Sequence, residues 1–256
     1  MTTSTAEELL TGWQDWHDER EAAAAAPHGL TSVVGTHWLG TEPVSLPTVA
    51  GTWAVDGDDR AVVSGLPASS GSSADTRTLA VGETLDLGGV QVRAMAGARG
   101  IGVRVFDPEA DTRTAFLGID TFPADPDRIV EATYTAHDPA PVVTIDHADG
   151  SRTDEVLIGQ VTFDFDGRQV VLGAFDAPEG RLHISFADAT SGGPNAAFRF
   201  LTLDAPDASG HVTVDLNRAY LPPSTFAAHY LCPLPPAGNR LDVPIAAGER
   251  RVQRRG

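Results

Sequence analysis

The sequence predicts a mainly β fold, a single antiparallel barrel-like or sandwich domain with an N-terminal α-helix. Helical periodicity is limited to the start of the 256-residue chain, before Pro27. From Gly51 onward, short runs alternate apolar and polar residues with a period of two, and Gly, Asp or Pro bounds these runs. No second long amphipathic pattern follows. We therefore expect the helix in residues 1–30, an all-β domain in residues 31–250 and a basic tail in residues 251–256.

The N-terminal helix has a start signal, a packing face and a stop signal. Ser4 opens a sequence with the spacing of a capping box. Leu9, Trp13 and Trp16 then recur at the i, i+4 and i+7 positions of one helical face, which predicts that they pack against the main domain rather than contact a ligand. Pro27 predicts the end of the helix just before it.

The strands follow at regular intervals. The strongest signal is residues 161–172, where Asp166-Gly167 joins two β-rich runs and predicts a two-residue hairpin turn, because this dipeptide tolerates positive φ. Residues 64–78 are rich in Ser, Gly and Ala, which predicts an exposed loop. The predicted strands, in chain order, are residues 52–55, 90–95, 101–106, 161–165, 168–172, 182–186, 198–203 and 212–216.

The acidic composition of the chain argues against two classes of binding partner, nucleic acids and anionic membranes. The formal net charge is −17, all 18 basic residues are arginine, and 24 aspartates outnumber 11 glutamates. Such a chain would be repelled by a phosphate backbone, so we expect no nucleic acid and no anionic membrane as a partner. No basic segment followed by an apolar one opens the chain, and no run approaches the length of a membrane span, so we expect a cytoplasmic protein.

The cysteine and histidine spacing predicts no metal site and no cofactor. The single cysteine, Cys232, excludes an intrachain disulfide, and no closed zinc-site spacing occurs. We expect Cys232 to be a buried, inert thiol, although a turn that brought His229 to it would create a nucleophilic pair. A metal site made of His183, His229 and Asp188 is possible in principle, but the spacing does not single it out.

Several motifs together resemble the bacterial family designated domain of unknown function 1684. The resemblance extends over roughly residues 13–250 and is most specific in the last third. It implies a shared fold and a shared site, without an assigned activity. Two departures stand out: Ser224 replaces the cysteine that the family often has after the paired prolines, and residues 194–197 lack the family's usual Thr-Tyr pair. The motifs are Trp16, GTHWL (35–39), RGIGVRVFDP (99–108), FP (122–123), DP (125–126), FADATSG (186–192), RFL (199–201), DLNRAY (215–220), PP (222–223), CPLPP (232–236), Asn239 and AGE (247–249).

The segment 214–241 is the best candidate to frame a site. Five prolines stiffen it, and Asp215, Asn217, Arg218 and Tyr220 lie at its start. Two interpretations are compatible with this pattern. The polar groups form a buried network that fastens an irregular backbone to the sheet, or they orient a ligand in a pocket under the segment.

Three arginines lie within the motifs and would suit an anionic ligand if they converge. Arg104, Arg199 and Arg218 could hold a carboxylate or phosphate through forked hydrogen bonds. Separate salt bridges to aspartates are the alternative. Asp188 begins a turn rich in glycine and hydroxyl groups, which could bind an anion through its backbone amides, but the nucleophile elbow that would activate Ser191 is absent.

The sequence therefore predicts binding of a small, anionic organic molecule under segment 214–241, with hydrolysis or isomerisation as an open extension. No catalytic set is recognisable. The alternative, from another class, is a non-catalytic structural or protein-interaction module. The predicted ligand-binding residues are Arg104, Asp188, Arg199, Asn217, Arg218 and Tyr220.

Overall fold

The computed structural model describes residues 6–66, 76–97 and 99–256, with side chains from residue 12 on. The capping box at Ser4 and the middle of the predicted loop 64–78 lie outside these residues. Contacts within the chain divide it into two compact units, and both contain parts of residues 31–250, which we expected to form one domain. Unit 1 consists of residues 1–21, 117–225 and 231–253, and unit 2 of residues 22–116, 226–230 and 254–256.

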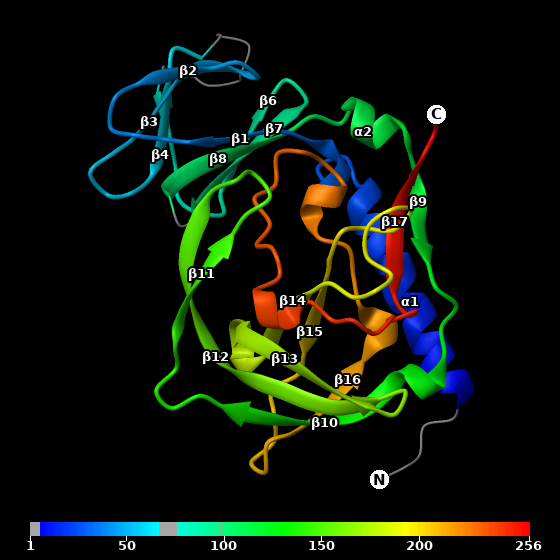
Figure 1. Cartoon of the computed structure of the whole chain (residues 1–256). Coiled ribbons are helices and arrows are strands. Elements are labelled where there is room, and N and C mark those ends of the chain that lie inside the picture. The colour runs from blue at the N-terminus through cyan, green and yellow to red at the C-terminus, as the bar shows by residue number, and fades with distance from the viewer. Residues whose placement is uncertain (1–5, 67–75, 98) are drawn as a thin grey trace. The chain divides into compact units, whose positions relative to one another are not determined.

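Unit 1 is built on one antiparallel sheet that curves into a half-barrel (Figure 1). The strand order is β15-β14-β13-β12-β10-β16, with β11 paired to β12 beside this path, and β9 pairs with β17 in a separate ribbon. Helix α1 (Ala6–Ala25) runs beside that ribbon. The strands are β9 (Phe116–Thr121), β10 (Ile129–Ala136), β11 (Val142–Asp146), β12 (Arg152–Phe165), β13 (Arg168–Asp176), β14 (Leu182–Phe186), β15 (Arg199–Leu203), β16 (His211–Asp215) and β17 (Glu249–Arg254).

The core of unit 1 follows from the alternation of its strands. On β13, Val170, Leu172 and Ala174 are buried, while Val171 between them is 39% exposed, as the two-residue period of a strand requires. The buried residues join one hydrophobic cluster with the inner faces of β12, β14, β15 and β16. Short 3-10 turns connect the irregular parts: η3 (Pro126–Arg128), η4 (Pro178–Gly180), η5 (Leu216–Arg218), η6 (Pro223–Thr225) and η7 (Ala237–Asn239).

The predicted hairpin turn between β12 and β13 is confirmed. Phe165 pairs with Arg168 across the end of the hairpin, which leaves a two-residue connection. Asp166 and Gly167 both have positive φ, at 48° and 76°. This is the conformation that matches the right-handed twist of the flanking strands and favours the Asp-Gly dipeptide.

Unit 2 contains two four-stranded antiparallel sheets, ordered β1-β8-β7-β6 and β2-β3-β4-β5. One cluster takes residues from both, including the fully buried Trp53 and Val63 of one sheet and Val92 and Val103 of the other, so the two sheets pack on each other. The elements of unit 2 are η1 (Leu30–Ser32), β1 (Val33–Trp38), β2 (Val44–Leu46), β3 (Val49–Val55), β4 (Ala61–Ser64), β5 (Thr76–Leu79), β6 (Thr84–Leu87), β7 (Val90–Gly97), β8 (Gly100–Phe106) and α2 (Asp111–Thr114).

The structure confirms the predicted mainly β, antiparallel class with an N-terminal helix. Helix α1 ends at Ala25, before Pro27, and Gly29 allows the chain to fold back. A Cβ on Gly29 would lie 2.2 Å from the carbonyl oxygen of Ala23, so no other residue fits there. Strand β17 includes residues 251–254 of the predicted basic tail. None of the described helices combines the length and apolar character needed to cross a membrane.

Candidate functional site

Arg199 and Asp188 are brought together by the structure, deep inside unit 1. Their side chains are 4% and 0% exposed and form a direct ion pair. The guanidinium also donates to the carbonyl oxygens of Ile245 (2.8 Å), Ala247 and Glu249 (3.4 Å). Burial lowers the pKa of Arg199, and the carboxylates of Asp188 and Glu249 oppose that shift. Arg199 therefore fastens β15 to the C-terminal segment.

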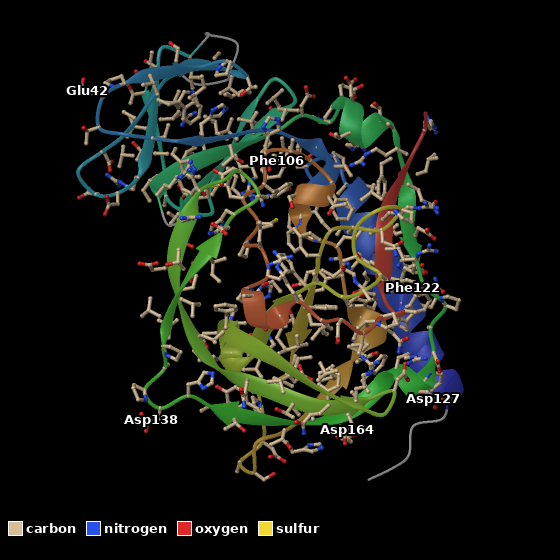
Figure 2. The ribbon with its side chains drawn as sticks, viewed as in Figure 1. Glu42, Phe106, Phe122, Asp127, Asp138 and Asp164 are labelled. Atoms are coloured by element: carbon tan, nitrogen blue, oxygen red, sulfur yellow. The ribbon has the colours of Figure 1, made fainter. Side chains whose placement is uncertain are left out.

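A second buried ion pair attaches helix α1. The side chain of Glu249 is fully buried and accepts two hydrogen bonds from the Arg20 guanidinium, that from Nη2 at 2.9 Å. The same carboxylate accepts the backbone N–H of Leu221 at 2.7 Å. The carbonyl oxygens and carboxylates around Arg199 and Arg20 thus hold segment 214–241, strand β17 and α1 together. Phe122, labelled in Figure 2, lies 4.8 Å from the Arg250 guanidinium and 5.9 Å from that of Arg199.

Asn217 and Arg218 both contact the Asp215 carboxylate. Asn217 is 4% exposed, and its amide exchanges two hydrogen bonds of 2.9 Å with the backbone of Asp125 while also donating to Asp215. Arg218 is half exposed and pairs with the Asp215 carboxylate at 3.3 Å. Burial raises the pKa of Asp215, and hydrogen bonds from Asn217 oppose the shift. These contacts are those of the structural network that the sequence allowed.

Tyr220 lies at the edge of an aromatic group. Its hydroxyl shares a 3.0 Å hydrogen bond with Thr202, and its ring lies under the Arg20 guanidinium at 4.8 Å. The ring also meets Phe200 edge-on, with 5.7 Å between centroids. Burial raises the pKa of the Tyr220 hydroxyl. Tyr220 therefore contacts both Arg20 of α1 and Thr202 of β15.

Arg104 belongs to unit 2, so its predicted convergence with Arg199 and Arg218 stays a prediction. Within unit 2 its guanidinium lies 4.5 Å from the Tyr230 ring centroid, and its Nε donates to Thr36 at 3.3 Å. The β7–β8 register places it directly opposite Arg93, a second positive charge on the same face. Arg93 makes no ion pair with a described residue and stacks on Phe106 at 4.9 Å.

Cys232 is buried, as predicted, and is 4% exposed. Its sulfur accepts the backbone N–H of Ser224 at 3.3 Å. His229 belongs to unit 2 and Cys232 to unit 1, so the His229–Cys232 pair is untested. Among the residues described, no three His, Cys, Asp or Glu side chains are arranged to hold a metal ion.

A cavity of about 270 Å³ in unit 1 is lined by one residue of segment 214–241, Pro233. Backbone pairing places Pro233 there: it forms a bridge with His147, and the N–H of Leu234 donates to Asp146 at 2.8 Å. Beneath it lie the ends of β11, β12, β13 and β14. The complete lining is Ile145, His147, Glu155, Phe175, Asp176, His183, Ser185 and Pro233.

Asn239 keeps β13 and β14 apart beside this cavity. The two strands pair only at Phe175–His183 and Asp176–Leu182. Beyond this point the Asn239 amide, 1% exposed, accepts from the N–H of Gly173 at 2.7 Å and donates to the carbonyls of Gly173 and Ser185, each at 2.9 Å. A side chain thus replaces the missing strand pairing and fixes the backbone of Ser185.

His183 and Ser185 are polar side chains without a hydrogen bond to any described residue. Both point to the same face of β14, two residues apart, and both line the cavity. Ser185 is only 2% exposed. The His183 ring packs edge-on against Phe200, at 4.8 Å, and burial lowers its pKa. Neither residue has a buried side-chain atom that lacks a partner, so the polar atoms of both are accessible from the cavity.

The other polar residues of the lining are two acidic residues, Glu155 and Asp176, and His147, whose Nε2 is hydrogen-bonded. Glu155 and Asp176 are exposed at the rim, and neither forms an ion pair with a described residue. Thr153 donates to Glu155 at 2.9 Å and is 2.7 Å from Nε2 of His147. Because a hydroxyl has one proton, His147 must donate to Thr153, and its buried Nδ1 lacks a partner.

The predicted residues and the cavity lining are therefore different sets. The lining includes Pro233 from segment 214–241, and the sequence did not identify the other lining residues. The alternation of Leu182 and Ile184 with His183 and Ser185 was visible, but nothing local shows that the polar face is covered. The covering residues come from about 50 positions further along the chain.

The structure is thus that of an antiparallel β protein with a small, partly polar cavity beside a proline-rich segment. Comparison of the sequence with known protein families shows which family it belongs to. The family model described as Protein of unknown function (DUF1684) matches residues 114–250, more than half of the chain, so the chain belongs to this family. Among solved structures, it is similar to an uncharacterized protein of Haloarcula marismortui determined by solution NMR. The two are 33% identical, the match covers 53% of this chain and 77% of that one, and the TM-score is 0.44. No curated protein matches the chain.

Proposed function

We propose that this protein binds a small organic molecule in the cavity under Pro233. The observation that carries the proposal is the pair of unpartnered polar groups, His183 and Ser185, in a lining that also contains Ile145 and Phe175. Ligand sites are typically concave and mostly apolar, with a few polar groups that fix orientation. A ligand that displaces solvent from the cavity must hydrogen-bond to both groups, because a polar group that is buried without a partner costs free energy.

The lining does not favour the anionic ligand that the sequence predicted. Arg199 and Arg218 are engaged in the contacts described above, and no arginine lines the cavity. Anions nevertheless belong in the test, because Arg93 and Arg104 form a locally positive face in unit 2. We therefore include carboxylates and phosphates among the compounds tried.

Binding can be tested with a panel of small alcohols, amides, amines, carboxylates and phosphates, read out by thermal melts and by two-dimensional NMR. We expect some members to raise the melting temperature and to shift the backbone resonances of β14. Ser185→Val and His183→Phe keep the packing but remove the polar atoms, so both should weaken binding. Thr213→Val, which removes a hydroxyl from an exposed position of β16, is the matched control. The absence of any ligand, or equal binding by all variants, would contradict the proposal.

Hydrolysis or isomerisation of the bound molecule is an extension of the same proposal. Its support is that burial lowers the pKa of His183, so a neutral imidazole that can accept a proton faces the cavity at neutral pH. Incubation of each identified ligand with the protein, followed by NMR of the small molecule, would reveal a product. A ligand that stays unchanged over days, at a rate equal to that without protein, identifies a binding protein rather than an enzyme.

The second candidate function is a structural or protein-interaction module, and the network around Arg199 and Glu249 favours it. Motif residues of unit 1 such as Arg199 and Glu249 connect one part of the chain to another through hydrogen bonds. Under this alternative the cavity takes up no compound, and His183→Phe and Ser185→Val leave every measured property other than stability unchanged.

A further inference from the structure

We propose that the ligand of this cavity is an organic cation, an amine with a small apolar or aromatic body. This inference rests on the proposed function and specifies its chemistry. It follows from the charges at the rim, from the unpartnered polar groups inside and from the apolar surfaces between them.

The rim of the cavity has two carboxylates that no cation of the described chain neutralises. The side chain of Asp176 makes neither a hydrogen bond nor an ion pair with a described residue, and that of Glu155 accepts one hydrogen bond, from Thr153. No arginine is part of the lining, and the chain has no lysine. With a formal net charge of −17, the surrounding field also attracts cations to this mouth.

The interior offers acceptors rather than positive charge. Ser185 is 2% exposed and lines the cavity, and its hydroxyl has no hydrogen bond to a described residue. The imidazole of His183 is uncharged near neutral pH because burial lowers its pKa, so one ring nitrogen accepts a hydrogen bond. An ammonium group has three donors and no acceptor, so each N–H can bond to a hydroxyl, an imidazole nitrogen or a carboxylate of the lining.

The apolar part of the lining suits the body of such a ligand. Ile145, Phe175 and Pro233 present hydrocarbon and ring surfaces. A cation beside the Phe175 ring would gain further from the negative face of the ring. A bare metal ion does not fit the same site, because within the described part of the chain no three ligating side chains come together.

Other charge classes are disfavoured by the same groups. A carboxylate or phosphate would face Glu155 and Asp176 without a compensating base. A neutral alcohol could satisfy Ser185 and His183, but it would gain nothing from the rim. The three classes therefore differ in affinity even when the apolar body is the same.

The test uses three probes of nearly equal size: benzylamine, benzyl alcohol and benzoate. Each is titrated into the full chain near pH 7 at low salt, and the dissociation constant is measured by NMR shifts of β14. We expect benzylamine to bind about tenfold or more tighter than benzyl alcohol, and benzoate weakest of the three. Because screening weakens exposed charge interactions, 0.5 M salt should reduce the advantage of the amine.

Variants locate the effect at the rim. Glu155→Gln and Asp176→Asn should each weaken benzylamine about three- to tenfold and leave benzyl alcohol unchanged. Asp164→Asn is the matched control, since Asp164, labelled in Figure 2, is exposed on β12 and does not line the cavity. The control should leave all three constants unchanged.

The outcomes separate this inference from the proposed function. If amine and alcohol bind equally and both depend on Ser185, the protein binds small molecules but the preference for a cation is wrong. Tightest binding by benzoate would also overturn it. If no probe shifts β14 at millimolar concentration, both the inference and the proposed function fail.

Discussion

Arg199→Ala is the sharpest test of the buried network. The guanidinium is the only ion-pair partner that the structure gives the fully buried Asp188 carboxylate, and it also donates to three backbone carbonyls. Removing one member of a buried ion pair costs about 3–5 kcal/mol, because the other charge is left uncompensated. The carbonyls that lose their donor add about 1 kcal/mol. We therefore expect a loss of about 4–6 kcal/mol in the free energy of unfolding.

Urea unfolding followed by tryptophan fluorescence measures this loss. Arg218→Ala is the matched control, because Arg218 is 47% exposed and has one ion pair, for which about 0.2–1 kcal/mol is typical. If Arg199→Ala does not fold, Arg199→Met combined with Asp188→Leu removes both charges and should be more stable than Arg199→Ala. A cost for Arg199→Ala no larger than that of Arg218→Ala would refute the reasoning and return Arg199 to the list of free ligand-binding groups.

Four further expectations test other parts of the fold. Asn239→Ala should lower the free energy of unfolding by about 2–3 kcal/mol, because three hydrogen bonds to the backbone are lost. In the same urea experiment, Asn195→Ala at a partly exposed position should lower it by less than about 1 kcal/mol. Equal losses would show that the Asn239 amide does not hold the strands. Gly167→Val should cost about 1 kcal/mol or more by forcing a branched residue to φ 76°, and an unchanged denaturation midpoint would contradict this. Arg93→Glu should raise stability by about 0.2–1 kcal/mol, since it replaces a like-charge cross-strand pair with an opposite-charge pair, so a lower melting temperature would count against the register. Burial lowers the pKa of His183 below its ordinary value of 6.5, so the unfolded chain takes up the proton first and stability falls as pH drops below 6.5. His183→Gln should flatten this part of the curve of stability against pH. An unchanged slope would show that the imidazole has an ordinary pKa in the folded protein.

The fold class was predictable because it depends on local periodicity. Alternation along residues 168–172 and 182–186 and the Asp166-Gly167 dipeptide specify strands and a turn without knowledge of distant residues. The division into two units was not predictable in this way. Phe116 ends the first long stretch of unit 2 and residues 226–230 return to it, so the division is not a point in the sequence.

The candidate site was predictable only in part, for a physical reason. Motif residues such as Asn217 and Arg199 are conspicuous because irregular backbone needs side chains to satisfy its polar groups, and one residue of that segment, Pro233, lines the cavity. The chemistry of the cavity instead depends on which face of β14 is covered. That is decided by the bridge between His147 and Pro233, 86 residues apart, and local patterns do not report pairing at this separation.

The anchoring contacts and the proposed binding site therefore involve different residues. Arg199 and Glu249 hold the C-terminal part of the chain through buried charges, while Pro233 lines a cavity in which the His183 and Ser185 side chains have no hydrogen bond to a described residue. The two functions meet at Asn239, whose amide bonds to the carbonyl of Ser185. Substitutions in the ion pairs should consequently change stability with little effect on ligand preference, and substitutions of His183 or Glu155 should do the reverse. Asn239 is the position where both should change together, because the backbone that presents the Ser185 hydroxyl depends on it.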